Sequence, residues 1–190
     1  SKHPKHVSLI WSYSTYILYK NLIINILKHQ VKDIMKFINN LNSLSEIEFV
    51  SIFGSVFEKS EWIANEAYKL KPFKDAEDLM NKMTNIYENS SKEIIVKIFN
   101  LHPKLAIEKK LTNFSSKEQS GAKLDKCTKE ELLEFENLNL NYEKKFQFPF
   151  IIAVKGKDKN NILNNFRQRI QNDYFVEFNE AKSQVKKIAL

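Results

Sequence analysis

The 190 residues suffice for one domain with a single hydrophobic core, and 43% hydrophobic content with 14 phenylalanines excludes a disordered chain. Three glycines and four prolines leave few turns, which argues against a many-stranded β fold and favours long helices. The net charge of +7 raises a nucleic-acid-binding class, but the lysines are interleaved with 23 acidic residues and form no single basic stripe.

Cysteine and histidine are too few and too scattered for a metal site. The single cysteine, Cys127, excludes a disulfide framework or a cysteine zinc site and fits a reducing compartment. The four histidines, His3, His6, His29 and His102, show no paired-ligand spacing. We therefore expect no metal.

The first predicted element is an apolar segment over residues 7–27, in which Lys20 is the single charge. Its length suits a membrane span or the hydrophobic part of a signal peptide. However, serine, threonine and asparagine side chains dilute it, and no small-x-small cleavage site follows. We interpret residues 1–30 as an extra N-terminal helix that packs on the domain or on a second subunit, and residues 31–190 as the main domain.

From Asp33 onward the pattern predicts a series of helices that begin at serine or threonine capping residues. The capping residues are Ser43 (with Glu46), Ser60, Ser90 (with Glu93) and Thr128 (with Glu131). Apolar residues at helical spacing give the predicted core. Among them are Ile47, Phe49, Ile52, Phe53, Trp62, Phe73, Ala76, Leu79, Met80, Met83 and Tyr87. Two C-terminal helices meet near Asn172. We expect an all-α fold, a single compact bundle of about eight or nine helices.

Two features of the second half of the chain point to ligand contacts. Residues 146–154 are an apolar run that contains Pro149, too short for a helix, and they predict a buried extended segment whose backbone amides can meet a ligand. Only Arg167 and Arg169 among the 30 basic residues are arginines. An arginine meets a planar, two-point hydrogen-bonding need that an ammonium group cannot. A solvated helix face accounts adequately for Arg167.

An imidazole and a carboxylate, His102 and Glu118, lie sixteen positions apart and form a candidate acid/base pair. Each also has a structural interpretation. Ser115-x-x-Glu118 matches a capping box, and His102 before Pro103 ends a helix in an extended conformation. At a helix end the unpaired carbonyls favour a protonated imidazole. From these residues alone, the structural interpretations are favoured.

Four ordered motifs surround this pair. They are Leu101-His102-Pro103-x-Leu105-Ala106, Ser115-x-x-Glu118-Gln119-x-Gly121-Ala122-x-Leu124-Asp125, Leu138-Asn139-x-x-Tyr142-x-x-Lys145-Phe146 and Phe148-Pro149-Phe150-Ile151. From about Leu44 to the C-terminus, the chain resembles the 2-oxo-4-hydroxy-4-carboxy-5-ureidoimidazoline (OHCU) decarboxylases of urate breakdown. Glu61 stands where that family usually has proline, and Lys123 and Gln147 where it usually has glycine. Lys123 is the departure that would crowd a ligand loop.

The resemblance implies a cofactor-independent and metal-independent carboxy-lyase that converts OHCU to (S)-allantoin, in a homodimer. In this scheme His102 is the general acid/base, Glu118 accepts from the substrate hydroxyl or a ring N–H, and Arg169 binds substrate oxygens with two parallel hydrogen bonds. The remaining implied substrate-binding residues are Pro103, Ser115, Gln119, Phe148, Ile151 and Ile152. Asp125 and Glu177 match motif positions, and we assign them structural roles as helix caps or salt-bridge partners.

Two other interpretations stay open. One is a catalytically inactive homologue, with its site blocked by Lys123, that uses its N-terminal segment or its many aromatic residues as an interface. The other is a basic helical module that binds nucleic acid, although we expect no nucleic-acid partner and no membrane association. The sequence Lys187-Ile188-Ala189-Leu190 does not match the Ser-Lys-Leu peroxisomal signal, and we expect a cytoplasmic protein.

Overall fold

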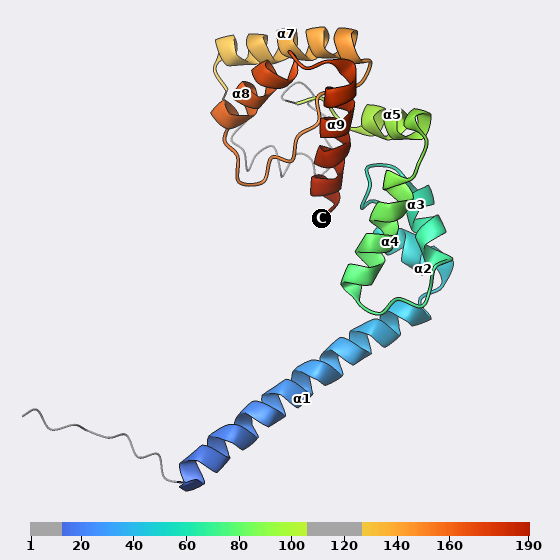
Figure 1. Cartoon of the computed structure of the whole chain (residues 1–190), viewed down its shortest axis with the longest axis vertical. Helices are drawn as coiled ribbons and strands as arrows, with labels where there is room; N and C mark the ends of the chain where they lie inside the picture. The colour runs from blue at the N-terminus through green and yellow to red at the C-terminus, as the bar shows by residue number, and fades with distance from the viewer. Residues whose placement is uncertain (1–12, 106–126) are drawn as a thin grey trace, which may run out of the picture. The chain divides into compact units, whose positions relative to one another are not determined.

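The structure, a computed structural model, describes residues 13–105 and 127–190, and every regular element in these ranges is a helix (Figure 1). The eight helices of the described ranges are α1 (Tyr13–Ser43), α2 (Glu46–Phe53), α3 (Glu61–Tyr68), α4 (Ala76–Glu88), α5 (Lys92–Leu101), α7 (Lys129–Phe146), α8 (Lys159–Arg169) and α9 (Tyr174–Ala189). The predicted all-α class is confirmed. The chain divides into two units, Ser1–Leu44 and Ser45–Leu190.

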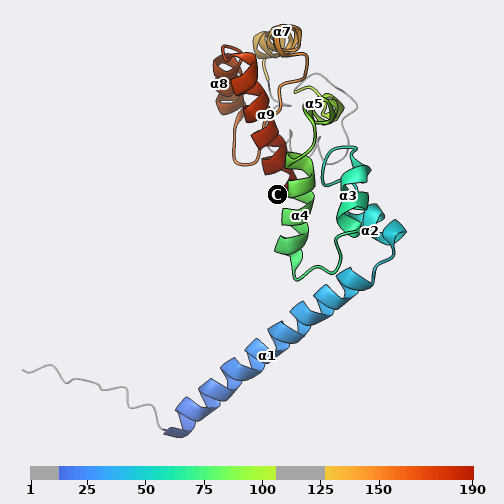
Figure 2. The same ribbon diagram turned by 45° about the vertical axis from the view of Figure 1, so that its right-hand side comes forward.

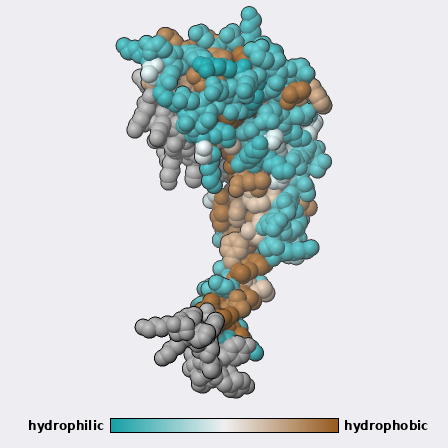
Figure 3. Space-filling view, turned by 60° about the vertical axis from the view of Figure 1, so that its left-hand side comes forward, coloured by the Kyte–Doolittle hydropathy of each residue, from teal (hydrophilic) through white to brown (hydrophobic). Residues whose placement is uncertain are grey.

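The predicted N-terminal helix is present as α1, and it runs past residue 30, where the sequence suggested a boundary, to Ser43. Its side chains Leu27, Val31 and Ile34 share one helix face and are all more than half exposed. Figure 3 shows hydrophobic side chains along this helix in brown. None of the helices in the described ranges is long and apolar enough to cross a membrane. Packing of α1 on the domain or on a second subunit stays a prediction.

The start of α2 differs from the predicted one by two residues. Ser45 and Glu48 form the capping box, not Ser43 and Glu46. The reason is that α1 continues through Ser43, whose hydroxyl donates to the carbonyl of Asn40 at 2.9 Å. Ser45 is therefore the first serine that has left α1, and its side chain is available to accept from the amide of Glu48.

The start of α5 is displaced by one residue for a similar reason. Ser90 donates its hydroxyl to the carbonyl of Ile86, at 2.8 Å, and so completes the last turn of α4. Ser91 then caps α5 by accepting from the amide of Ile94. The predicted capping box of α7, Thr128 with Glu131, is confirmed.

The first half of the domain packs α3 against both α2 and α4. Phe49 of α2 is fully buried and stacks on Phe73, with ring centroids 5.6 Å apart. Ala76, also predicted for the core, is exposed at the start of α4. In α2 and α3, three residues predicted for the core lie at the surface, since these two helices of eight residues each bury only one side. The exposed residues are Ile47, Ile52 and Trp62.

The second half of the domain places α7 against α8 and α9, and α5 against α9 (Figures 1 and 2). Its core is aromatic. The ring of Tyr142 meets Phe146, Phe150 and Phe166 at centroid distances of 4.6, 5.4 and 5.5 Å. The segment 147–154 between α7 and α8 is neither helix nor strand, and six of its residues are buried. They are Phe148, Pro149, Phe150, Ile151, Ile152 and Val154. The prediction of a buried, non-helical segment is confirmed for residues 148–154, whereas Phe146, its predicted first residue, is the last residue of α7.

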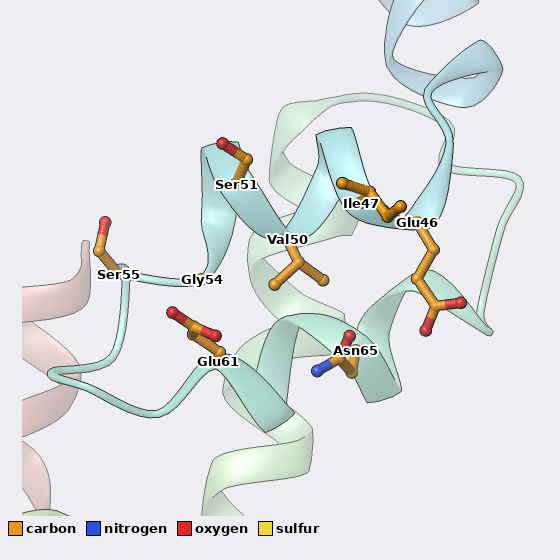
Figure 4. A pocket seen from close by; sticks show the side chains of 8 residues that line it. All are labelled: Glu46, Ile47, Val50, Ser51, Gly54, Ser55, Glu61 and Asn65. Atoms are coloured by element: carbon orange, nitrogen blue, oxygen red, sulfur yellow. The ribbon is translucent and has the colours of Figure 1, made fainter.

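Gly54 ends α2 at a point where no side chain fits. A Cβ atom added there would lie 2.5 Å from the carbonyl oxygen of Val50 and 3.0 Å from Cγ of Glu61, across the hollow between α2 and α3 (Figure 4). The nearest obstacle is backbone, which cannot rotate away as a side chain can. The glycine in this position is therefore required by close approach, because its φ of −63° suits any residue.

We expect Gly54→Ala to lower the free energy of unfolding by about 1–3 kcal/mol, because the added methyl forces the backbone of α2 to shift. Urea denaturation measures this. Ser51→Ala on the exposed side of the same helix is the control, expected to stay within about 0.5 kcal/mol of the parent chain. Equal stability of the two variants would contradict the argument.

Candidate active site

His102 follows the last residue of α5, with φ −74° and ψ 139°, the extended conformation that the following proline requires. Its ring Nδ1 lies 2.9 Å from the carbonyl oxygen of Ile98, one of the carbonyls that the helix end leaves without an amide partner. A carbonyl only accepts, so Nδ1 carries a proton and donates it. In the neutral ring the lone pair then lies on Nε2, the atom left for proton transfer.

Burial lowers the pKa of the His102 imidazole, and the hydrogen bond to the carbonyl of Ile98 raises that pKa by a smaller amount. The expectation that the helix end favours the protonated ring was therefore wrong in its outcome. The carbonyl of Ile98 at the helix end does favour the protonated ring. However, the free-energy penalty for removing the charged ring from water is larger than this favourable effect. At neutral pH the ring is uncharged and can act first as a base.

The chain beyond His102 is fixed by α7. The side-chain amide of Asn139 donates to the carbonyl of Leu105 at 3.2 Å and to that of Phe135 at 2.8 Å. Lys104 forms an ion pair with Glu143, at 2.9 Å. Asn139 is buried, and its hydrogen bond to the carbonyl of Leu105 connects two of the sequence motifs. These motifs are the one that begins at Leu101 and the one that begins at Leu138.

The end of α5 also borders the buried segment 147–154. The rings of Phe99 and Phe148 lie 4.9 Å apart, and the amide of Asn100 donates to the carbonyl of Gln147 at 3.4 Å. The segment that we predicted to contact a ligand therefore begins beside α5, the helix that ends directly before His102.

Arg169 is bound at the other side of the same segment. Its Nη1 donates to the carbonyl of Ile151 at 2.8 Å, while Nε and Nη2 donate to one oxygen of Glu177 at 3.0 and 2.5 Å. Its guanidinium lies over the ring of Phe150, 4.4 Å from the centroid. Three of the five guanidinium N–H groups are thereby used within the domain. Arg167, by contrast, is exposed and paired with Glu134, as expected for a solvated face.

Among the predicted site residues that the structure describes, the contacts connect two groups. Phe99, three residues before His102, contacts Phe148, and Arg169 donates to the carbonyl of Ile151. Ile152 follows in the same buried segment. Ser115, Glu118 and Gln119 lie outside the described residues, as do Lys123 and Asp125.

Sequence reasoning did not assign Asn139, Tyr142 or Gln184 any role near the site. All three are buried polar side chains on the inner faces of α7 and α9. The signal that could have found them is a polar residue at an apolar position of a helix, because such a group must have a partner when buried.

Gln147, the residue where the resembled family has glycine, ends α7 in the left-handed region with φ 64° and ψ 21°. Its backbone amide donates to the carbonyl of Glu143 at 2.8 Å, and its side-chain amide donates to the carbonyl of Lys144 at 2.9 Å. Glycine is the usual residue in this conformation, because a Cβ atom is strained there. The family glycine is thus explained by helix termination.

The model of the OHCU decarboxylase family matches residues 42–190. The chain is 31% identical over 152 residues to a 2-oxo-4-hydroxy-4-carboxy-5-ureidoimidazoline decarboxylase of Haloferax volcanii, covering 80% of this chain and 90% of that protein. It is 32% identical over 158 residues to the protein of the same name from Xenopus laevis, covering 80% and 89%. The chain therefore belongs to the OHCU decarboxylase family.

Larger proteins also match. A uric acid degradation bifunctional protein of Bacillus sp. (strain TB-90) is 39% identical over 153 residues, which is 80% of this chain. The chain spans 30% of the length of that relative and 31% of the similar protein PucL of Bacillus subtilis. A crystal structure of (S)-allantoin synthase superimposes with a TM-score of 0.64 at 29% identity, covering 80% of this chain and 50% of that one.

The pKa of His102 predicts a pH dependence of stability. Its folded-state pKa is lowered from an unfolded value of about 6.5, so between these two values the unfolded chain binds more protons. The stabilisation is present above about pH 6.5 and is lost as the pH falls through that value toward the folded pKa. We expect the parent chain to lose more stability than His102→Gln between pH 7 and pH 5, measured by urea denaturation. Parallel profiles for the two chains would contradict a lowered pKa for the part-buried His102.

Two variants separate backbone strain from side-chain capping at Gln147. Both Gln147→Gly and Gln147→Ala lose the side-chain hydrogen bond, but only alanine keeps a Cβ in the left-handed region. We expect the glycine variant to be more stable than the alanine variant by about 1 kcal/mol in thermal or urea unfolding. Equal stabilities would mean that residue 147 leaves this conformation when its side chain is shortened.

Proposed function

We propose that this chain decarboxylates OHCU to (S)-allantoin and carbon dioxide, as a step of urate degradation. The observation that carries the proposal is the family match over residues 42–190, within which the carbonyl of Ile98 binds Nδ1 of His102 and burial lowers the pKa of the imidazole. An imidazole that acts as a base must be uncharged at the working pH, and a lowered pKa favours this form of His102.

The chemistry of OHCU explains why a positioned base suffices. The carbon that bears the hydroxyl and carboxylate lies beside the carbon that bears the ureido group and is double-bonded to a ring nitrogen. When the bond to the carboxylate breaks, its electron pair forms a double bond between these two carbons, and the ring nitrogen takes the C=N pair and a proton. The enol hydroxyl then gives up its proton while the ureido-bearing carbon gains one. The substrate itself supplies the electron sink.

In this proposal Nε2 of His102 takes the hydroxyl proton and returns a proton to one face of the ureido-bearing carbon, which sets the handedness of allantoin. Glu118 orients the hydroxyl or a ring N–H. Pro103, Ser115 and Gln119 line the site, with the backbone of residues 148–152.

Arg169 is proposed to contact substrate oxygens with the two N–H groups not used by Glu177 and Ile151, one on each terminal nitrogen. These two groups remain for the expected pair of hydrogen bonds, because the edge formed by Nε and Nη2 already binds Glu177.

We also propose that the protein is a homodimer, as the family resemblance implies, and light scattering during size-exclusion chromatography measures this. A cytoplasmic location stays a prediction.

The test uses freshly generated OHCU, since the compound also decays without enzyme. Loss of its ultraviolet absorbance and the circular dichroism of allantoin are followed with and without the protein. We expect fast loss with one-handed product. His102→Ala should lower the turnover rate by about 10²–10⁴-fold, as for other acid/base residues, with the fold retained.

His29→Ala is the matched control, because it removes an imidazole from α1, outside the family match, and should leave the rate unchanged. An uncatalysed rate with racemic allantoin would reject the proposal and support the catalytically inactive homologue. A fully active His102→Ala variant would reject the assignment of the acid/base.

A further inference from the structure

The segment between Phe148 and Ile152 has no regular secondary structure to fix its backbone, although it is buried. In the described ranges, a side chain of α8 binds the backbone of this segment at Ile151, and a side chain of α9 binds the backbone at Ala153, the residue that follows it. Nη1 of Arg169 donates to the carbonyl of Ile151 at 2.8 Å, and the side-chain oxygen of Gln184 accepts from the amide of Ala153 at 2.8 Å. A buried backbone group needs a partner, and these contacts supply partners two residues apart.

The guanidinium of Arg169 also contacts two further neighbours. Glu177 accepts from its Nε and Nη2, and the ring of Phe150 lies beneath it. Phe150 is stacked on Phe166 of the same helix as Arg169, with centroids 3.9 Å apart and planes inclined by only 9°. The carbonyl contact and the ring contact thus join Arg169 to adjacent residues of the segment.

Glu177 is fully buried, and both of its oxygens accept hydrogen bonds. Oε1 accepts from Nε and Nη2 of Arg169 and from the hydroxyl of Tyr142, and Oε2 accepts from the side-chain amide of Asn172 at 2.8 Å. Because the carboxylate is fully buried and paired with Arg169, we assign any effect of Glu177 on a reaction to Arg169.

Glu177 and Gln184 lie seven residues apart on α9, which puts them on one face of the helix. Both are buried on that face with Ala181 between them. The nitrogen of Gln184 donates to Glu180 at 2.7 Å, which orients its oxygen toward the segment. One face of α9 thus carries two polar anchors for the same stretch of backbone.

We propose that Glu177, acting through Arg169, and Gln184, acting directly, are positioning residues that set the backbone of residues 148–152 against the substrate. Tyr142 completes this set by fixing the Glu177 carboxylate. The inference rests on the proposed function, since it needs the segment to line the OHCU site. It gives α9 a role in catalysis without contact with the reacting atoms.

Tyr142→Phe is the sharpest variant, because it removes one hydroxyl from the network and leaves the buried charge pair and the ring packing in place. Its matched control is Tyr87→Phe, also fully buried, whose hydroxyl donates to the carbonyl of Lys182 and not to the segment. Gln184→Met removes the acceptor of the Ala153 amide at similar size, and Gln168→Met on the exposed side of α8 is its control.

Two readouts separate positioning from mere stability. The first is nuclear magnetic resonance of the Ile151 and Ile152 amides and of selectively labelled arginine, for which only Arg167 and Arg169 give signals. We expect resolved, slowly rotating guanidinium signals for Arg169 that collapse in Tyr142→Phe, and averaged signals for exposed Arg167 throughout. The second readout is KM against kcat, together with the enantiomeric excess of allantoin.

We expect Tyr142→Phe and Gln184→Met to shift the Ile151 and Ile152 amide signals, raise KM for OHCU about tenfold and lower the enantiomeric excess. Both controls should match the parent chain. Variants that change only the melting temperature and keep KM and enantiomeric excess would overturn the inference. A parent chain without turnover would reject the proposed function, and unchanged Arg169 and Ile151 signals in Tyr142→Phe would then reject the positioning separately.

Discussion

The ion pair between Glu177 and Arg169 is the interaction on which the second half of the domain depends. It joins α9 to α8, and through Tyr142 and the Ile151 carbonyl it extends to α7 and to the segment between α7 and α8. A buried carboxylate is costly unless it is paired and its remaining lone pairs are satisfied. Here both conditions are met, so the network favours a single arrangement of three helices rather than adding much net stability.

Aromatic rings surround the ion pair between Arg169 and Glu177 and give it an apolar environment. Tyr142, Phe150 and Phe166 exclude water from the pair, and a charge in such surroundings interacts strongly with its partner. Burial also acts on His102, whose pKa it lowers. In the described residues the imidazole is bonded to the carbonyl of Ile98, whereas the guanidinium of Arg169 is paired with the carboxylate of Glu177.

The sequence predicted the features that depend on nearby residues. The capping box at Thr128, the helix end at His102 and the buried segment over 147–154 all follow from a few neighbouring side chains. The wrong capping residues at Ser43 and Ser90 arose because a second serine followed within one or two positions. The choice between such serines depends on where the preceding helix ends.

Features that depend on distant residues were not accessible in this way. Glu177 was expected to be a salt-bridge partner or cap, but nothing in the pattern indicated Arg169 as its partner or Tyr142, 35 positions away, as a third member. The pKa direction of His102 required the degree of burial, which periodicity does not give. Trp62 was assigned to the core as an apolar residue of a predicted helix, whereas Ile63 and Ala64 occupy the inner face of α3.

The two arginines of α8 have a further consequence for how this helix is held. They are two positions apart, which is about 200° around a helix, and they bind acidic residues of different neighbours, Glu134 of α7 and Glu177 of α9. Turning α8 about its own axis would break both pairs at once and carry the buried guanidinium away from its carboxylate. The only two arginines of the chain therefore form ion pairs on different faces of α8, and together these pairs fix the rotation of this short helix about its axis.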